Sequence, residues 1–464
     1  MGESEKNRLA KDVTSFRGSF FNSFAGQAPT YSVAGGAAFI ISSAFASAPL
    51  AMLLTLIGVL SIIYAIYYLS KRYVHAASFY AYVSKTLGTS AGFFNGITYA
   101  LFYSIIGLAS VAIAFAYLTT EGLYASFNII INPLYFLAIP VIIAFLVAYL
   151  GLKPSIRSEV VLASIEFSIL IIFIVLSFIF NYSRISVVPF TLKGTFTKSL
   201  PSSISAISGG LVFAITYFMG FEVSTQISEE VKNPKRDIPI GTLFATTLMG
   251  LIYILVTYSI ILNTGISYSS LNKFVSEASG TGVNPVYTLM GKYMGHIGIT
   301  IFSFIVILSV FACYLATLNA TARMFYGMAR EGQLPKALEK THSKYKSPHT
   351  SLYFSTGLTA LVIILTYVAA IILGYRGRIG LTYNAMQIGY AIDSLYYVIS
   401  LALLSVSAIK SSKPIGKVIS IIGLSILAIT FYYSIVNIYY LVAIIISSVL
   451  IVIYYASGLP YRKR

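Results

Sequence analysis

Apolar runs of about 20 residues recur along the whole chain, separated by short polar segments. Each run is long enough to cross roughly 30 Å of hydrocarbon as an α-helix. The composition agrees, because 57% of the residues are hydrophobic and only 10% are charged, whereas a soluble domain carries about 25% charged residues. The sequence therefore predicts an all-α integral membrane protein.

The apolar windows and their flanks predict twelve transmembrane helices. If the N-terminus is inside, 24 of the 31 Lys and Arg residues lie on inside segments and 7 lie outside, as the positive-inside rule requires. Both termini are therefore expected to be cytoplasmic, in a multi-pass protein of the cell membrane. The net charge of +17 follows from this topology and does not predict a nucleic-acid partner, whose site would gather basic residues on one soluble face. The predicted spans are 19–46, 48–70, 91–119, 134–151, 157–181, 203–230, 238–264, 296–326, 350–373, 381–409, 414–436 and 438–458.

Two of these spans are interrupted by polar, glycine and proline residues. The first contains SFAGQAPTYS at 23–32, and Pro29 removes a backbone donor and breaks or kinks the helix. The sixth loses its apolar character at 216–222 (TYFMGFE), which is tolerated only where the chain is buried in protein or lines a cavity. Two broken helices in corresponding places predict an inverted-repeat transporter with its binding site between them.

The breaks in spans one and six divide the chain into a five-plus-five inverted repeat. The two remaining helices are appended after the second repeat. The predicted parts are a cytoplasmic tail (1–18), the first five-helix repeat (19–181), the second, inverted five-helix repeat (203–409), helices 11 and 12 (410–458) and a second cytoplasmic tail (459–464).

Three stretches resemble the amino acid-polyamine-organocation (APC) superfamily of secondary transporters. They are the turn EEVKNPKRDIP at 229–239, YAYV with LG and GF at 80–93, and ARMFYGMAREG followed by LP at 322–335. The resemblance implies the leucine-transporter-like fold, alternating access, and a substrate with an amino group, most often an amino acid. Family members often carry Gly-Ser-Gly in the first break and some gate the site with a Trp; this chain has neither.

An amino acid needs an anion site and a cation site a few ångströms apart. The second half of span one would present free N–H groups to the carboxylate, and the unwound part of span six would present carbonyls to the ammonium. Gly26 and Gly220 would allow the close backbone approach. The predicted substrate-binding residues are Gly26, Gln27, Ala28, Pro29, Thr30, Tyr31, Thr216, Tyr217, Phe218, Met219, Gly220 and Phe221.

Acidic residues within spans are costly and therefore functional candidates. In the fold that the resemblance implies, span five adjoins span one near the ion site, so Glu166 is the favoured proton-coupling residue. Asp393 is a second candidate, or pairs with Tyr390 or Tyr397. Glu222 lies in a GFE element similar to the family's, which favours a structural or proton-linked role over contact with substrate ammonium. Near the start of span five, we expect Glu159 to be a boundary residue paired with Arg157.

The coupling mode stays open at this point. A sodium-coupled symporter would need hydroxyls and carbonyls from spans one and eight, where Thr317 is a candidate. An exchanger of amino acids or amines and a sensor on a transporter scaffold are further alternatives. The four His residues are dispersed, so no metal site is predicted, and there is no GxxxxGK[ST] loop for ATP. We expect no cofactor, no enzyme activity and a small-molecule substrate, with the bilayer and a proton or sodium ion as further partners.

Overall fold

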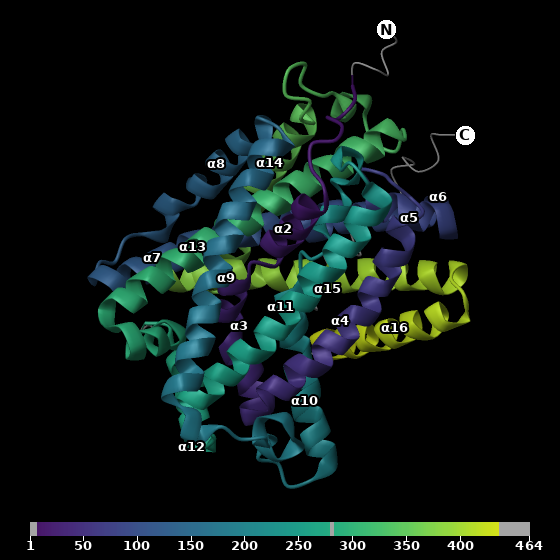
Figure 1. The fold of residues 1–464 in the computed structure, drawn as a ribbon. Coiled ribbons are helices and arrows are strands. Elements are labelled where there is room, and N and C mark those ends of the chain that lie inside the picture. The colour runs from purple at the N-terminus through teal and green to yellow at the C-terminus, as the bar shows by residue number, and fades with distance from the viewer. Residues whose placement is uncertain (1–6, 279–282, 436–464) are drawn as a thin grey trace.

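The computed structural model describes residues 7–278 and 283–435, and Figure 1 shows how their helices are arranged. This part of the chain is helical, with one isolated parallel β-bridge between Thr14 and Val231. Its α-helices are α2 (Phe16–Gln27), α3 (Pro29–Ala44), α4 (Ala48–Ser70), α5 (Ser78–Leu87), α6 (Thr89–Ile97), α7 (Ile106–Phe127), α8 (Ala138–Tyr149), α9 (Leu152–Phe180), α10 (Leu200–Ala214), α11 (Pro234–Thr264), α12 (Tyr268–Ala278), α13 (Pro285–Arg330), α14 (His349–Ile372), α15 (Arg378–Ser411) and α16 (Pro414–Ile435). A π-helical turn, Thr98–Ile105, joins α6 to α7.

The helices agree with the expectation of an all-α membrane protein. Nine helical segments of the described chain are long and apolar enough to cross a membrane, and the first of them, Phe16–Ser70, contains α2, α3 and α4. Helical elements occur at each of the first eleven predicted spans. The twelfth span, 438–458, lies outside the described residues, so the count of twelve and the division into repeats stay predictions.

Helices α2 and α3 lie in the middle of the bundle (Figure 1). α2 packs against α9, α11 and α13, and α3 packs against α10 and α13. Close packing depends on small residues: a Cβ on Gly250 of α11 would lie 2.2 Å from Leu56 of α4, and such small positions let membrane helices approach closely. We call the region that holds residues 7–15, 226–233 and 323–331 the tail face, because hydrogen bonds and ion pairs join these segments.

Candidate substrate and coupling site

The first span breaks between α2 and α3, where the sequence predicts it. α2 ends at Gln27, Ala28 has left-handed backbone angles (φ 43°, ψ 65°), and α3 begins at Pro29. Proline suits the first position of a helix because its missing N–H would have no partner there. The Ser32 hydroxyl donates to the Gln27 carbonyl at 2.9 Å, which satisfies one carbonyl at the break.

The second break is longer than the sequence predicts. α10 ends at Ala214, a 3-10 turn covers Ile215–Phe218, and Gly220 has φ 90°. Short turns then continue to Glu230, and no α-helix resumes before Pro234. The prediction of a membrane helix continuing to residue 230 is therefore wrong, although the break itself is confirmed. Irregular backbone is tolerated at this depth because it is buried in protein rather than exposed to lipid.

The two breaks touch each other at Gly26 and Gly220. A Cβ on Gly26 would lie 2.3 Å from the Gly220 carbonyl oxygen, and a Cβ on Gly220 would lie 2.3 Å from the Gly26 carbonyl oxygen. Only glycine fits at either position, and at Gly220 the positive φ adds a second reason. The structure thus brings the two predicted halves of the site together.

The other predicted substrate-binding residues divide into two groups. Gln27, Ala28, Pro29 and Thr30 are buried beside the first break. Tyr217 and Phe218 pack against Tyr253 of α11, with ring centroids 5.0 and 5.4 Å apart, and Phe221 lies edge-on to Tyr397. Thr216 is exposed and, with the half-buried Met219, faces a small recess formed with α15, so these two side chains point away from the contact between the breaks. Tyr31 is half-buried and its hydroxyl binds that of Tyr390.

Glu166 of α9 lies beside the first break and is fully buried. Its Oε2 accepts hydrogen bonds from the hydroxyl of Ser309 at 2.5 Å and from the backbone N–H of Thr30 at 3.4 Å. Its Oε1 has no hydrogen-bond partner in the described structure. The acid therefore connects α9, the start of α3 and α13 at one point.

Ser309 is a site residue that the sequence reasoning missed. It also accepts from the N–H of Tyr31 at 3.2 Å. Ser309, Cys313 and Thr317 are spaced by four residues, which places them on one face of α13, and the Cys313 thiol donates to the Gly26 carbonyl at 3.3 Å. This four-residue spacing is the sequence signal that could have identified Ser309. Thr317 itself lies two turns from Ser309, and its carbonyl accepts from the Thr321 hydroxyl.

Glu222 is held by two tyrosines from other helices. It accepts from the hydroxyl of Tyr99 at 2.9 Å and from that of Tyr397 at 2.7 Å. Tyr99 was not predicted, and it lies in the π-helical turn before α7, a local irregularity that is frequent at functional sites. These contacts favour a structural role that ties the second break to α15.

Asp393 is buried on α15 against Gly107 of α7, and its Oδ1 has no partner in the described structure. The expected partners are engaged elsewhere: Tyr390 binds Tyr31, and Tyr397 donates to Glu222. The predicted pairing of Asp393 with a tyrosine is therefore wrong.

Glu159 is not a boundary residue. It is fully buried and accepts from the Asn22 amide of α2 at 2.9 Å, whereas Arg157 is exposed. The predicted Glu159–Arg157 pair is wrong because residues 157 and 159 point to different sides of α9: the buried positions 159, 163, 166 and 170 follow the helical period.

The turn 229–239 ties the tail face together. Glu230 forms a fully buried ion pair with Arg323 of α13, and Arg323 also donates to the side chain of Asn319 at 2.9 Å. Glu229 accepts two hydrogen bonds from Arg330 at 2.5 and 2.7 Å. Burial raises the pKa of Glu229, but the hydrogen bonds and positive charge of Arg330, together with the Ala76 N–H and His75, outweigh burial and hold the pKa below its ordinary value.

The N-terminal tail adds a further layer over this turn. The N–H groups of Val13 and Thr14 donate to the Glu230 carbonyl, and the Lys232 N–H donates to Thr14. The Tyr326 hydroxyl reaches the Asn7 carbonyl at 2.7 Å. The tail face is therefore closed by charge pairs and backbone hydrogen bonds.

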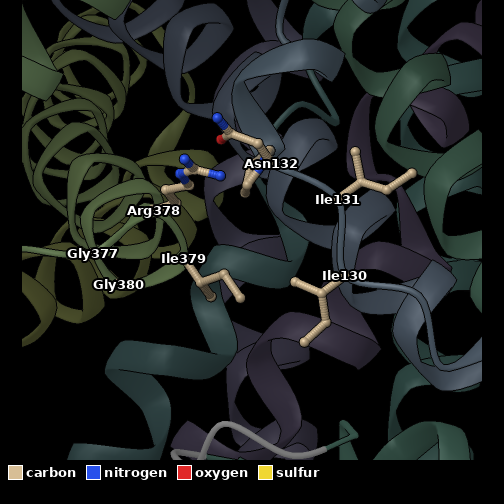
Figure 2. Close-up of a pocket in the computed structure, with 8 residues that line it drawn as sticks. Ile130, Ile131, Asn132, Gly377, Arg378, Ile379 and Gly380 are labelled. Atoms are coloured by element: carbon tan, nitrogen blue, oxygen red, sulfur yellow. The ribbon is translucent and has the colours of Figure 1, made fainter.

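A separate cavity of about 360 Å³ lies between residues 130–133 and 377–380. Figure 2 shows Arg378 and Asn132 projecting toward each other across it, with isoleucines around them. None of its lining residues belongs to either break, so this cavity is not the candidate site.

Known transporters and permeases are similar in sequence to this chain. The chain is 27% identical over 356 residues to the methylthioribose transporter of Bacillus subtilis (71% of this chain, 67% of the relative). It is 24% identical over 215 residues to the branched-chain amino acid permease BcaP of the same organism (46% and 42%). It is 26% identical over 310 residues to the low-affinity putrescine importer PlaP of Escherichia coli (65% and 64%). The chain thus spans less than two thirds of the length of BcaP and PlaP.

Two solved structures share the fold. The manganese transporter of Eremococcus coleocola superposes with a TM-score of 0.54 at 14% identity, covering 99% of this chain and 97% of that one. A Na⁺-coupled sialic acid symporter gives 0.52 at 12% identity, with 94% of each chain covered. The model of the amino acid permease family matches residues 18–464. This multi-pass membrane protein therefore belongs to the amino acid permease family of the APC superfamily.

Proposed function

We propose that this permease is a secondary active transporter that moves amino acids or related amines by alternating access and is driven by protons. Its termini are then cytoplasmic, so the tail face is the cytoplasmic face, in line with the 24 to 7 distribution of basic residues. Family membership and the contact between the two broken spans support this function.

The position of Glu166 is the main support for its proposed role in proton coupling. The carboxyl is shielded from water, has no ion-pair partner among the described residues, and touches the first break and α13 at once. A buried acid of this kind binds and releases a proton when its surroundings change. Because Ser309 and Thr30 belong to different helices, a relative movement of α13 and α3 changes the donors around the acid.

The second break supplies acceptors for an amino group. Within the described chain, no hydrogen bond reaches the carbonyl oxygens of Tyr217 and Met219. Free carbonyls at a broken helix suit an ammonium group or another hydrogen-bond donor. The named relatives carry a branched-chain amino acid, putrescine or methylthioribose, so leucine, lysine, putrescine and methylthioribose form a suitable panel.

The test is uptake of this panel into proteoliposomes under separate proton and sodium gradients. We expect a proton gradient to drive accumulation, and Glu166→Gln to abolish that accumulation while sparing exchange of substrate for substrate. Glu277→Gln, in an exposed pair with Lys273, is the matched control and leaves uptake unchanged. Accumulation that follows only sodium, or that keeps its proton dependence in Glu166→Gln, contradicts the coupling role.

A further inference from the structure

The start of α3 is where a bound amino acid would place its carboxylate. The first N–H groups of a helix lack partners within the helix and attract anions. In α3 the first residue is Pro29, which has no N–H at all. The capacity of this helix end for an anion therefore depends on the N–H groups of Thr30, Tyr31 and Ser32.

All three of these N–H groups already have partners within the protein. Thr30 donates to Glu166 at 3.4 Å, Tyr31 donates to the Ser309 hydroxyl at 3.2 Å, and Ser32 donates to the Ala28 carbonyl at 2.8 Å. Ser309 in turn donates to the same oxygen of Glu166 at 2.5 Å. The carboxylate at the start of α3 is thus the protein's own.

A second carboxylate would meet unfavourable electrostatics at this position. Glu166 is fully buried, so in its ionised form it repels a second carboxylate strongly in this poorly solvated site. In its protonated form it still occupies the Thr30 N–H and the Ser309 hydroxyl. No Lys or Arg forms an ion pair with Glu166 in the described chain, and the buried Arg323 is already bound to Glu230 and Asn319. Nothing nearby compensates for an additional negative charge.

The second break offers the opposite chemistry. The carbonyls of Tyr217 and Met219, which accept no hydrogen bond in the described structure, point to a ligand with donors. We infer, on the basis of the proposed transport function, that the substrates are amines without a free carboxylate. Glu166 fills the position that the carboxylate of an amino acid would take.

Matched pairs of ligands that differ by one carboxylate test this directly. The pairs are putrescine and ornithine, cadaverine and lysine, 3-methylbutylamine and leucine, and tyramine and tyrosine. In proteoliposomes of the full chain, we expect at least one amine to be taken up at least tenfold faster than its amino acid. Equal rates or faster uptake of the amino acids overturn the inference and leave the transport function standing. Uptake of neither member of any pair, nor of methylthioribose, refutes the transport function itself.

Substitution of Glu166 provides a second test of the inference. Glu166→Ala frees the Thr30 N–H and the Ser309 hydroxyl, so in exchange assays at equal pH the ratio of amine to amino acid uptake is expected to shift at least tenfold toward the amino acid. Glu166→Gln, which keeps the shape and removes the charge, is measured alongside in case the alanine variant does not fold. Glu277→Gln is the control and keeps the wild-type ratio. A ratio that stays unshifted in both folded Glu166 variants overturns the inference.

Discussion

The buried ion pair between Glu230 and Arg323 allows a quantitative test of the tail-face structure. Both side chains are 1% exposed, and Arg323 donates to Glu230 through two nitrogens. Removing one member of a buried pair leaves an uncompensated charge and costs about 3–5 kcal/mol. Glu230→Gln leaves the charge of Arg323 buried and uncompensated.

This loss of folding free energy corresponds to a decrease in melting temperature. At about 2.1 cal/mol/K per residue, a chain of 464 residues has an unfolding entropy near 1 kcal/mol/K, so the loss corresponds to roughly 3–5 °C. The chain contains no Trp, so far-UV circular dichroism of the purified protein in detergent is the suitable measurement.

Two controls separate this mechanism from a general effect of losing a carboxylate. In the exposed pair, Lys273 and Glu277 are 77% and 50% exposed, and a surface pair contributes about 0–1 kcal/mol, so Glu277→Gln lowers the melting temperature by less than about 1 °C. The double variant Glu230→Leu/Arg323→Met removes both charges and is expected to recover most of the loss, because paired apolar replacement is often neutral. A Glu230→Gln protein that melts within about 1 °C of the wild type refutes the reasoning.

Three further outcomes follow from the same contacts. Gly220→Ala places a Cβ 2.3 Å from a backbone oxygen at a φ of 90°; we expect loss of uptake with a destabilisation of about 1–3 kcal/mol or more, and unchanged uptake in proteoliposomes would show that the breaks do not pack this way. Tyr397→Phe removes a hydrogen bond to Glu222 and is expected to cost about 1.5–3 kcal/mol, whereas an unchanged melting temperature would show that this bond is not needed. The pKa of Glu229 is depressed in the folded protein by Arg330, so its stabilisation is present above the ordinary value of 4.5 and is lost as pH falls through the folded value. Glu229→Gln should therefore melt below the wild type at neutral pH, with the difference shrinking near pH 4; a constant difference would contradict this.

Several parts of the site follow from local sequence alone. Pro29, Gly26 and Gly220 mark the two breaks, because proline lacks a backbone donor and glycine permits a close backbone approach or a positive φ. Glu166 is a candidate because an acid within a span is costly wherever it faces, and the fold implied by the family resemblance favours it over the other acids. The extent of the second break was not predictable in this way. Its irregular backbone persists because side chains from other segments bind it, as Ser78 does with Thr225 and Ser23 with Ser224.

The sequence by itself determined that this is a multi-pass helical membrane protein with two interrupted spans, since hydropathy, proline and glycine act over a few residues. Its motifs added the resemblance to the APC superfamily. Only the tertiary structure decided what each buried acid binds. Glu166 meets Ser309 at a separation of 143 residues, Glu159 meets Asn22 at 137, and Glu222 meets Tyr99 at 123. Such partners depend on which face each helix turns toward its neighbours. That facing is set by the packing of the whole bundle, and it placed a carboxylate of the protein where the sequence suggested a carboxylate of the substrate.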